Sequence, residues 1–475
     1  MNLFGFQEYL CIFLYMIASV LFIMGIKKLG KADTARSGNL MSSIGMLIAV
    51  ISVLISQDVI PAGIVGYGII ACAIVIGSVI GFIWAKKVEM TGMPQLVALF
   101  NGFGGLSSML VAISQYLALR SGSTRIGSDP FTSITMGLTI VIGAVAFTGS
   151  LIAWGKLAGL KIFKKPISLP GKNVINSILL VIAVAGIGLY TYDPTGNLGF
   201  IGIIVTAATS LILGVTLVIT IGGGDMPVII SFLNALSGLA AAFAGFPIGN
   251  TVLIVSGCLV GASGVILTLI MCKAMNRTFT SLLFKSVAKK KSSAATGEQK
   301  EPRAMSVEDA YLVLEAAKNV VIVPGYGMAV AQAQHAVKEL CDKLEDNGSE
   351  VNFAIHPVAG RMPGHMNVLL AEANVPYEML KTSDDMNPQM DNVDVAIIIG
   401  ANDVVNPSAV DDESSPLYGM PIVEAFRART VFVLKRGKGT GFSGIENPLF
   451  TNDNTVMIYG DAKQTVSSLV SEFDS

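Results

Sequence analysis

The sequence has little charge, few histidines and no paired cysteine motif. Only 14% of its 475 residues are charged, whereas soluble proteins average about 25%. The formal net charge is −1, and no basic patch is interleaved with aromatic residues, which argues against nucleic-acid binding. The three histidines have no metal-ligand spacing, and the five cysteines form no CxxC motif, so we expect neither a metal site nor a redox-active thiol pair.

What the sequence has instead is long apolar runs, and they lie in its first 270 or so residues. Nine runs are long enough to cross a hydrocarbon layer of about 30 Å. The first is no cleaved signal peptide, because Glu8 precedes it and Lys27 and Lys28 end it. We therefore predict a polytopic helical membrane domain over residues 1–288. The expected spans are 9–26, 40–57, 63–85, 94–118, 132–154, 174–191, 199–221, 226–247 and 250–272.

Lysine and arginine predict the orientation of these spans, because cytoplasmic loops are enriched in both. With the N-terminus outside, seventeen of these residues flank the spans on the inside and only Arg120 and Arg125 on the outside. An odd number of spans then places the C-terminal part in the cytoplasm. The inside residues are Lys27, Lys28, Lys31, Arg36, Lys86, Lys87, Lys156, Lys161, Lys164, Lys165, Lys172, Lys273, Arg277, Lys285, Lys289, Lys290 and Lys291.

A few polar residues lie within the spans, where hydrocarbon penalises them. Asn101 is expected about 10 Å into the fourth span, Asn234 at similar depth in the eighth, and Ser150 in the fifth. Asp225 marks the cytoplasmic start of the eighth span. These residues either tie helices together or line a path. Because no acidic, basic or histidine residue lies in the middle of a span, a proton path would need water, amides and hydroxyls, or a titrating group from a partner.

Beyond the spans, residues 289–305 are small, polar and charged, as in a flexible tether. Ser306 followed by Asp309 is typical of a helix start. Strand-like runs at 320–324, 351–356, 377–381, 394–399, 430–434 and 455–459 alternate with several helical patterns. This alternation predicts, for residues 306–475, a Rossmann-like nucleotide-binding domain: an α/β domain with a doubly wound parallel sheet. Its binding site would lie at the carboxyl ends of the strands.

The first strand runs into a glycine turn that opens a helix. Glycines let the backbone turn sharply and approach a pyrophosphate, and the helix start from Met328 to Gln334 offers unpaired N–H groups. The usual GxGxxG pattern has three glycines, but here Val330 stands in place of the third. The place of the turn between a strand and a helix favours a dinucleotide site. The turn consists of Gly325, Tyr326, Gly327, Met328, Ala329 and Val330.

The charges at the other strand ends favour NADP over NAD. An NAD site usually has an acidic residue at the end of the second strand, whereas Arg361 follows that strand here. Lys435 and Arg436 end the fifth strand, and cations there suit a 2′-phosphate. Asp403, in the loop Gly400–Asp403, either faces the cofactor or caps a turn.

With these motifs, the chain resembles the beta subunit of the proton-translocating NAD(P)+ transhydrogenases over nearly its whole length. The resemblance rests on motifs in both halves, including the segment around Asp225. The others are Pro324–Gln334, His356–Asn367, Gly400–Pro407, Asn447–Phe450, Gly460–Lys463 and Met271–Arg277.

The resemblance implies an enzyme that binds NADP(H) and passes hydride to or from NAD(H) held by an alpha subunit, while a proton crosses the membrane. It implies that the glycine turn holds the pyrophosphate and that Lys435 and Arg436 hold the 2′-phosphate. It places Arg361, Gly400, Asn402 and Asp403 at the cofactor, with Asp403 sensing proton or redox state. Asn101, Ser150, Asn234 and Asp225 are then candidates for the proton path and its coupling. It further implies an inner-membrane location and a dimer of alpha–beta units.

The chain departs from the family in its fourth span. Many members have histidine where this chain has Asn101, and an amide does not titrate near neutral pH, whereas histidine does. We hypothesise that a histidine on a membrane helix of the alpha subunit carries the proton near Asn101, Ser150 and Asn234.

Two other functions share some of these features. An NADP-dependent enzyme anchored in the membrane would not need nine spans, although substrate turnover by the C-terminal part alone would favour it. A nucleotide-gated channel would need a carbonyl filter or charges within the spans. Nucleotide-dependent ion flux without hydride transfer would favour the channel.

Overall fold

The computed structural model describes most of the chain. The described residues are 3–56, 63–89, 92–122, 129–163, 167, 169–222, 225–284, 301–362, 364–413, 415, 417–437, 439, 441 and 444–474. Their contacts divide the chain into two compact units, Met1–Thr268 and Leu269–Ser475. Each unit is considered by itself below.

The first unit is a bundle of long apolar helices. Within the described residues, nine helices are long and apolar enough to cross a membrane, which confirms the nine expected spans. Helices suit this setting because all their backbone hydrogen bonds are made within the segment. They are α1 (Leu3–Leu29), α2 (Ala32–Leu54), α3 (Gly63–Lys87), α4 (Met93–Arg120), α5 (Pro130–Leu157), α6 (Lys172–Tyr192), α7 (Asn197–Val218), α8 (Met226–Gly245) and α9 (Thr251–Ala274).

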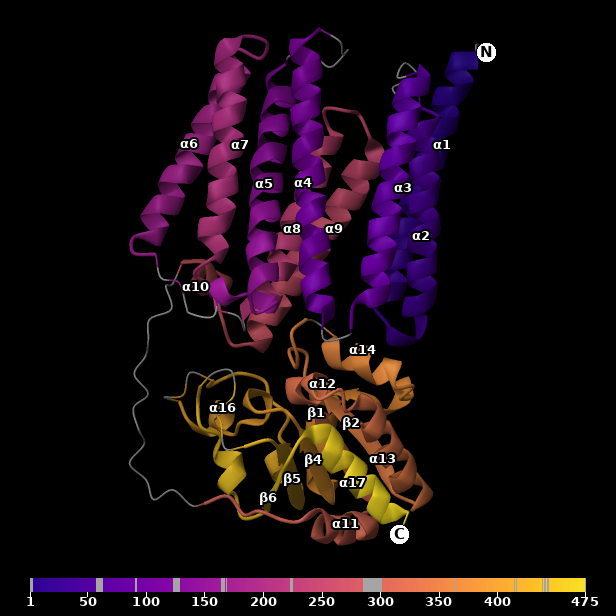
Figure 1. The fold of residues 1–475 in the computed structure, drawn as a ribbon, viewed down its shortest axis with the longest axis vertical. Helices are drawn as coiled ribbons and strands as arrows, with labels where there is room; N and C mark the ends of the chain where they lie inside the picture. Colours follow the sequence, from indigo (N-terminus) through magenta and orange to yellow (C-terminus); the bar gives the residue numbers. More distant parts are fainter. Residues whose placement is uncertain are drawn as a thin grey trace. The chain divides into compact units, whose positions relative to one another are not determined.

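Helix α5 lies among α4, α7 and α8 (Figure 1). Glycine pairs let these helices and their neighbours approach closely, as expected where packing drives association. A Cβ on Gly143 of α5 would lie 2.6 Å from the carbonyl oxygen of Gly105 on α4. A Cβ on Gly202 of α7 would lie 2.5 Å from that of Gly186 on α6.

The second unit contains a six-stranded sheet in the order β3-β2-β1-β4-β5-β6. Every neighbouring pair is parallel, which confirms the doubly wound sheet. The chain runs outward from β1 to one edge, returns to β4 beside β1, and then runs to the other edge. The strands are β1 (Asn319–Pro324), β2 (Glu350–Ile355), β3 (Leu380–Thr382), β4 (Val395–Ile399), β5 (Thr430–Lys435) and β6 (Thr455–Tyr459).

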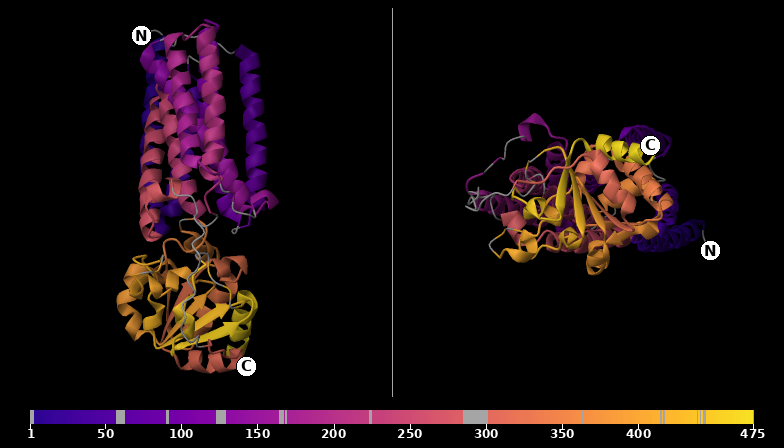
Figure 2. Two further views of the ribbon diagram at one scale, coloured as in Figure 1. Left: turned by 90° about the vertical axis from the view of Figure 1, so that its left-hand side faces the viewer. Right: turned by 90° about the horizontal axis from the view of Figure 1, so that it is seen from below.

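Helices cover both faces of the sheet, so its central strands are apolar throughout (Figure 2). On one face α13 packs against α17. On the other, Val321, Val323 and Ile398 join a core with the short segments between the later strands. The described helical segments are α10 (Phe279–Phe284), α11 (Val307–Ala316), α12 (Tyr326–Val330), α13 (Gln334–Asp346), α14 (His365–Glu372), η5 (Tyr377–Met379), α15 (Ser383–Met386), η6 (Asn387–Asn392), η7 (Asp403–Val405), α16 (Ser408–Asp411), η8 (Ala425–Arg427), η9 (Pro448–Thr451) and α17 (Ala462–Phe473).

Two local predictions need correction. The third strand was expected at 377–381, but Tyr377–Met379 forms a 3-10 turn after Pro376, and only Leu380–Thr382 is strand. The last residues of the expected tether at 289–305 pair with β6 instead. The backbone N–H of Met457 donates to the carbonyl oxygen of Arg303 at 2.7 Å, and the carbonyl oxygen of Met457 accepts from the N–H of Met305 at 3.0 Å. Residues 285–300 lie outside the described part of the chain. The helix start at Ser306 is confirmed, since its hydroxyl accepts from the backbone N–H of Asp309.

Candidate dinucleotide site and membrane polar cluster

The loops after β1 and β4 meet at the point where the winding of the sheet reverses. Ligands bind in the crevice at such a switch point. Here the N–H of Gly325 donates to the carbonyl oxygen of Ile399 at 2.9 Å, and the N–H of Gly327 donates to that of Gly400 at 2.9 Å. The two loops therefore brace each other at the carboxyl edge of the sheet.

Glycine is required on both sides of this crossing. A Cβ on Gly400 would lie 2.3 Å from the Cα of Gly327, and a Cβ on Gly325 would lie 2.4 Å from the backbone nitrogen of Ala401. Gly400 also has a φ of +66°, a conformation that other residues adopt only at a cost. Since the N–H groups of Gly325 and Gly327 are used inside the protein, these glycines provide close approach and not donors to a phosphate.

The helix that follows the glycine turn is shorter than predicted. Helix α12 ends at Val330, and Gln332 has a φ of +50° before α13 begins at Gln334. The continuous helix start expected from Met328 to Gln334 was therefore wrong. Met328 and Ala329 are fully buried, so they support the turn from beneath.

A cavity of about 290 Å³ opens beside this crossing, near the lower end of the range for ligand pockets, about 300–1,000 Å³. Residues from the ends of β4, β5 and β6 and from the turn after β1 line it. They are Gly327, Val330, Gly400, Ala401, Asn402, Leu434, Lys435, Arg436, Gly441, Gly460 and Ala462.

Asn402 presents a polar group in this lining. The side-chain amide of Asn447 holds it by donating to its carbonyl oxygen at 3.0 Å and to its Oδ1 at 3.1 Å. The Nδ2 of Asn402 is buried and has no hydrogen-bond partner. A buried donor without an acceptor is costly, so this amide suits an acceptor atom of a ligand.

Lys435 and Arg436 line the same cavity but have different neighbours. Lys435 lies over the ring of Phe450, 4.5 Å from its centroid, and donates to the carbonyl oxygen of Gly439. Burial lowers the pKa of Lys435, and the charge of Asp403 opposes that shift. Arg436 is more exposed and forms an ion pair with Asp461 at 3.0 Å.

Arg361 does not line the cavity. Its guanidinium carbon lies 4.4 Å from the ring centroid of Tyr326, so it stacks on the glycine turn. Its backbone N–H donates to Nδ1 of His365 at 3.0 Å. Burial, and then the charge of Arg361, lower the pKa of His365. This cluster joins the loop after β2 to the turn after β1.

Asp403 begins η7 beside Asn402. A Cβ on Gly441 would lie 2.4 Å from Oδ1 of Asp403.

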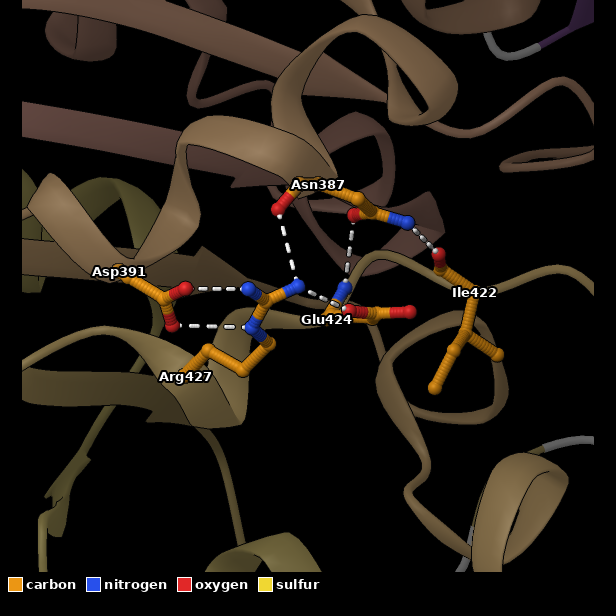
Figure 3. Close-up of polar contacts among 5 residues, drawn as sticks. All are labelled: Asn387, Asp391, Ile422, Glu424 and Arg427. Atoms are coloured by element: carbon orange, nitrogen blue, oxygen red, sulfur yellow. Dashed lines mark hydrogen bonds and ion pairs between the residues drawn. The ribbon is translucent and has the colours of Figure 1, made fainter.

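An ion-pair network fixes the segment that returns from the cavity to β5 (Figure 3). Arg427 donates through Nε to Asp391 at 2.9 Å and through Nη1 to Glu424 at 2.8 Å. The side chain of Asn387 donates to the carbonyl of Ile422 at 2.9 Å and accepts from the N–H of Glu424 at 3.0 Å. The network joins η6 to η8. Hydrogen bonding to Arg427 lowers the pKa of Asp391.

In the membrane unit, two of the predicted polar residues meet directly. The side-chain amide of Asn101 on α4 donates to the hydroxyl of Ser150 on α5 at 3.1 Å. Ser237 of α8 donates to the backbone carbonyl of Asn101 at 3.1 Å. The Oδ1 of Asn101 is buried and has no hydrogen-bond partner. Three helices therefore meet around an amide that retains one free acceptor.

Asn234 lies one turn from Ser237 but is exposed. Of residues Met226–Gly245, all of which the structure describes, it is the one exposed side chain. The other side chains of α8 are buried or partly buried. A polar amide at this depth does not suit lipid contact, so the exposed side chain of Asn234 suits a polar group from another protein segment.

Asp225 is buried and precedes α8 directly. The turn leading to it is held from α5 by Lys156. The ammonium of Lys156 donates to the carbonyl oxygens of Val218 at 3.0 Å, Ile219 at 2.7 Å and Ile221 at 2.5 Å. These carbonyls lie at or just beyond the end of α7, where a helix cannot pair them internally, and that of Val218 also accepts from the N–H of Ile221 at 3.1 Å. Lys156 thus links the helix that carries Ser150 to the segment before Asp225.

The site fits a phosphorylated dinucleotide in its chemistry. It combines a glycine-lined crevice, an amide donor without an acceptor and two cations at the carboxyl edge of a doubly wound sheet. In the described part of the chain, no three His, Cys, Asp or Glu side chains cluster as a metal site.

The sequence assigned no site role to several cavity residues, notably Leu434, Gly441 and Gly460. Asn447, which holds Asn402, and Asp461, which pairs with Arg436, lay in motifs of the family resemblance but were likewise given no role. Gly460 and Asp461 directly follow the predicted sixth strand, so the rule that sites lie at carboxyl ends of strands would have found them. Asn447 has no such signal, because its contact depends on how the loop after β5 folds back.

Comparison with known proteins supports this architecture. The family model described as NAD(P) transhydrogenase beta subunit matches residues 12–472. The NAD(P) transhydrogenase subunit beta of Rhodospirillum rubrum is 44% identical over 465 residues, which cover 96% of this chain and 97% of the relative. A second relative of the same description, from a defined strain of that species, matches to the same extent.

Proposed function

Because the chain belongs to the NAD(P) transhydrogenase beta-subunit family, we propose that its cavity binds NADP(H) and that its membrane bundle carries the coupled proton. The beta-subunit family implies an alpha subunit as partner. In our proposal that subunit holds NAD(H), and hydride passes reversibly between the two nucleotides. The observation that carries the proposal is that Lys435 and Arg436 both line the cavity.

The residues of this chain then bind and orient the nucleotide. When bound, the nicotinamide supplies the hydride donor or acceptor. Gly325, Gly327 and Gly400 keep side chains away from the pyrophosphate, and the free Nδ2 of Asn402 donates to an acceptor of the ligand. Lys435 and Arg436 balance the 2′-phosphate charge. Arg361 holds the glycine turn through Tyr326, and Asp403 lies close enough to influence the charge of Lys435.

For the proton, we propose a path through Asn101 and Ser150 that a titrating histidine of the alpha subunit completes. The free Oδ1 of Asn101 and the exposed amide of Asn234 support this idea, since both need polar partners at membrane depth. Replacing the alpha-subunit histidine should abolish proton pumping, and unimpaired pumping would end the hypothesis.

Coupling requires that the two states of the bundle differ in their effect on NADP(H) affinity. We propose that Asp225 and the turn before it transmit this difference, because Lys156 ties that turn to the helix of Ser150. The nine spans make the chain a multi-pass membrane protein. We further propose an inner-membrane location, an outside N-terminus, a cytoplasmic nucleotide domain and a dimer of alpha–beta units.

The test is a pair of binding titrations on the full-length chain in detergent. NADPH should bind at least about tenfold more tightly than NADH, because only NADPH carries the 2′-phosphate. Substituting Arg436→Gln should remove most of this preference and leave NADH binding unchanged.

Arg429→Gln is the matched control, since Arg429 precedes β5 and Arg436 follows it. Its guanidinium is exposed and pairs with Asp394 at 3.0 Å, so NADPH binding should persist in this variant. Equal affinity of the unmodified chain for NADPH and NADH would refute the proposed function.

A further inference from the structure

The cation best placed for the 2′-phosphate already has an anion within this chain. Nη2 of Arg436 lies 3.0 Å from Oδ2 of Asp461. Strand register explains this contact, because Lys435 of β5 is opposite Tyr459 of β6. The N–H of Gly460 also donates to the carbonyl oxygen of Lys435 at 3.1 Å. Arg436, the residue after Lys435, and Asp461, two residues after Tyr459, therefore lie close together at the carboxyl edge.

Asp461 stands at the cavity, since both of its chain neighbours, Gly460 and Ala462, line it. Its two carboxylate oxygens have separate partners. Oδ1 accepts from the backbone N–H of Lys463 at 3.1 Å and so caps α17, while Oδ2 meets Arg436.

Helix capping alone does not require the negative charge of this residue. Asparagine caps helix N-termini about as well as aspartate. The charge of Asp461 is therefore free for a second role, and the side chain of Arg436 is the group it meets.

We propose that Asp461 is an internal competitor for Arg436 that tunes NADP(H) affinity and release. Without ligand, the carboxylate pairs with the guanidinium. A bound 2′-phosphate must share or take that guanidinium while a like charge stands beside it, and like charges at this separation repel. The competitor weakens NADP(H) binding and speeds its release but has little effect on the unphosphorylated nucleotide. This inference rests on the proposed function and adds a residue that sets nucleotide exchange.

The test is Asp461→Asn in the full-length chain, because asparagine keeps the cap and removes the charge. NADPH should bind about two- to fivefold more tightly, the range expected from an exposed ion pair. Its dissociation should slow by a similar factor, while NADH binding should not change. In an Arg436→Gln background the same substitution should have a smaller effect on NADPH affinity, because only the direct repulsion between Asp461 and the 2′-phosphate remains.

Asp453→Asn is the matched control. Asp453 precedes β6 whereas Asp461 follows it, and its exposed carboxylate lies 3.9 Å from Arg303. The Asp453→Asn substitution removes one negative charge, as Asp461→Asn does, but at the opposite end of β6, so NADPH affinity should not change.

Unchanged or weaker NADPH binding in folded Asp461→Asn would overturn the inference, because Asp461 would then only cap α17 or orient Arg436. Thermal unfolding of the variant establishes that it is folded. This failure differs from failure of the proposed function, in which the unmodified chain itself shows no preference for NADPH over NADH.

Discussion

The membrane bundle and the sheet domain both bring backbone into contact at glycine and both hold a loop with a lysine, yet with different results. In the bundle, Gly105 and Gly143 join two regular helices, and Lys156 donates to three carbonyl oxygens. In the sheet domain, Gly327 and Gly400 join two irregular turns beside a cavity, and Lys435 lines that cavity. In the bundle, glycine and lysine let helices and their ends pack closely, whereas in the sheet domain the same residue types lie beside a cavity that can take a ligand.

The largest effect is expected at the crossing of the two turns. Gly400→Ala adds a Cβ 2.3 Å from the Cα of Gly327 and imposes a φ of +66° on alanine. Overpacking and the left-handed conformation together should cost about 3–5 kcal/mol, and NADPH binding should be lost. Denaturant unfolding and NADPH titration measure both effects.

Gly348→Ala separates the two causes. Gly348 has a φ of +83° but open space around its Cβ position, with the nearest atom 4.0 Å away. This variant should lose only about 1–2 kcal/mol and keep NADPH affinity. Equal losses for the two variants would show that the approach of the turns does not matter.

The half-buried lysine at the end of α5, Lys156, should come next. Lys156→Met leaves the end of α7 without its donor, and bonds to a charged group are worth about 1.5–3 kcal/mol. We expect the free energy of unfolding in detergent to fall by about 3 kcal/mol, with partial recovery in Lys156→Arg. Lys87→Met, at the exposed end of α3, serves as the control. If Lys156→Met were as stable as Lys87→Met, the anchoring role would be wrong.

Helix contact in the bundle gives a smaller effect. Gly143→Ala places a Cβ 2.6 Å from the carbonyl oxygen of Gly105, whereas a Cβ on Gly188 of α6 meets nothing within 4 Å. The first substitution should cost about 2 kcal/mol. Gly188→Ala should be neutral or stabilising, because alanine favours helix. Thermal unfolding of both variants decides, and a stabilised Gly143→Ala would contradict the close approach.

The smallest effect is a shift in pH dependence. Burial lowers the pKa of Lys435, so its ammonium loses its proton at lower pH than an exposed lysine. As pH rises through that pKa, the positive charge disappears and NADPH binding should weaken. Lys435→Arg should hold its affinity to higher pH, because arginine stays protonated. Titrations from pH 7 to 10 measure the shift, and identical profiles would exclude a titrating Lys435.

The sequence predicts elements well where a pattern is long or strictly local. Apolar runs gave nine spans because hydrocarbon tolerates little else, and strand ends located Lys435, Arg436 and Asn402 at one edge. The third strand was misplaced because Pro376 precedes a 3-10 turn that takes up the first three residues of the strand-like run. The break at Gln332 and the exposure of Asn234 depend on packing between distant segments. Local pattern carries no information about either.

The most direct test is hydride transfer from NADH to NADP+ by the chain and its alpha subunit in sealed vesicles with an internal pH indicator. A pH difference should form with transfer and collapse when a protonophore is added, and transfer should then be faster. Transfer at an unchanged rate with no pH difference, in vesicles shown to be tight, would contradict the coupling of hydride transfer to proton movement.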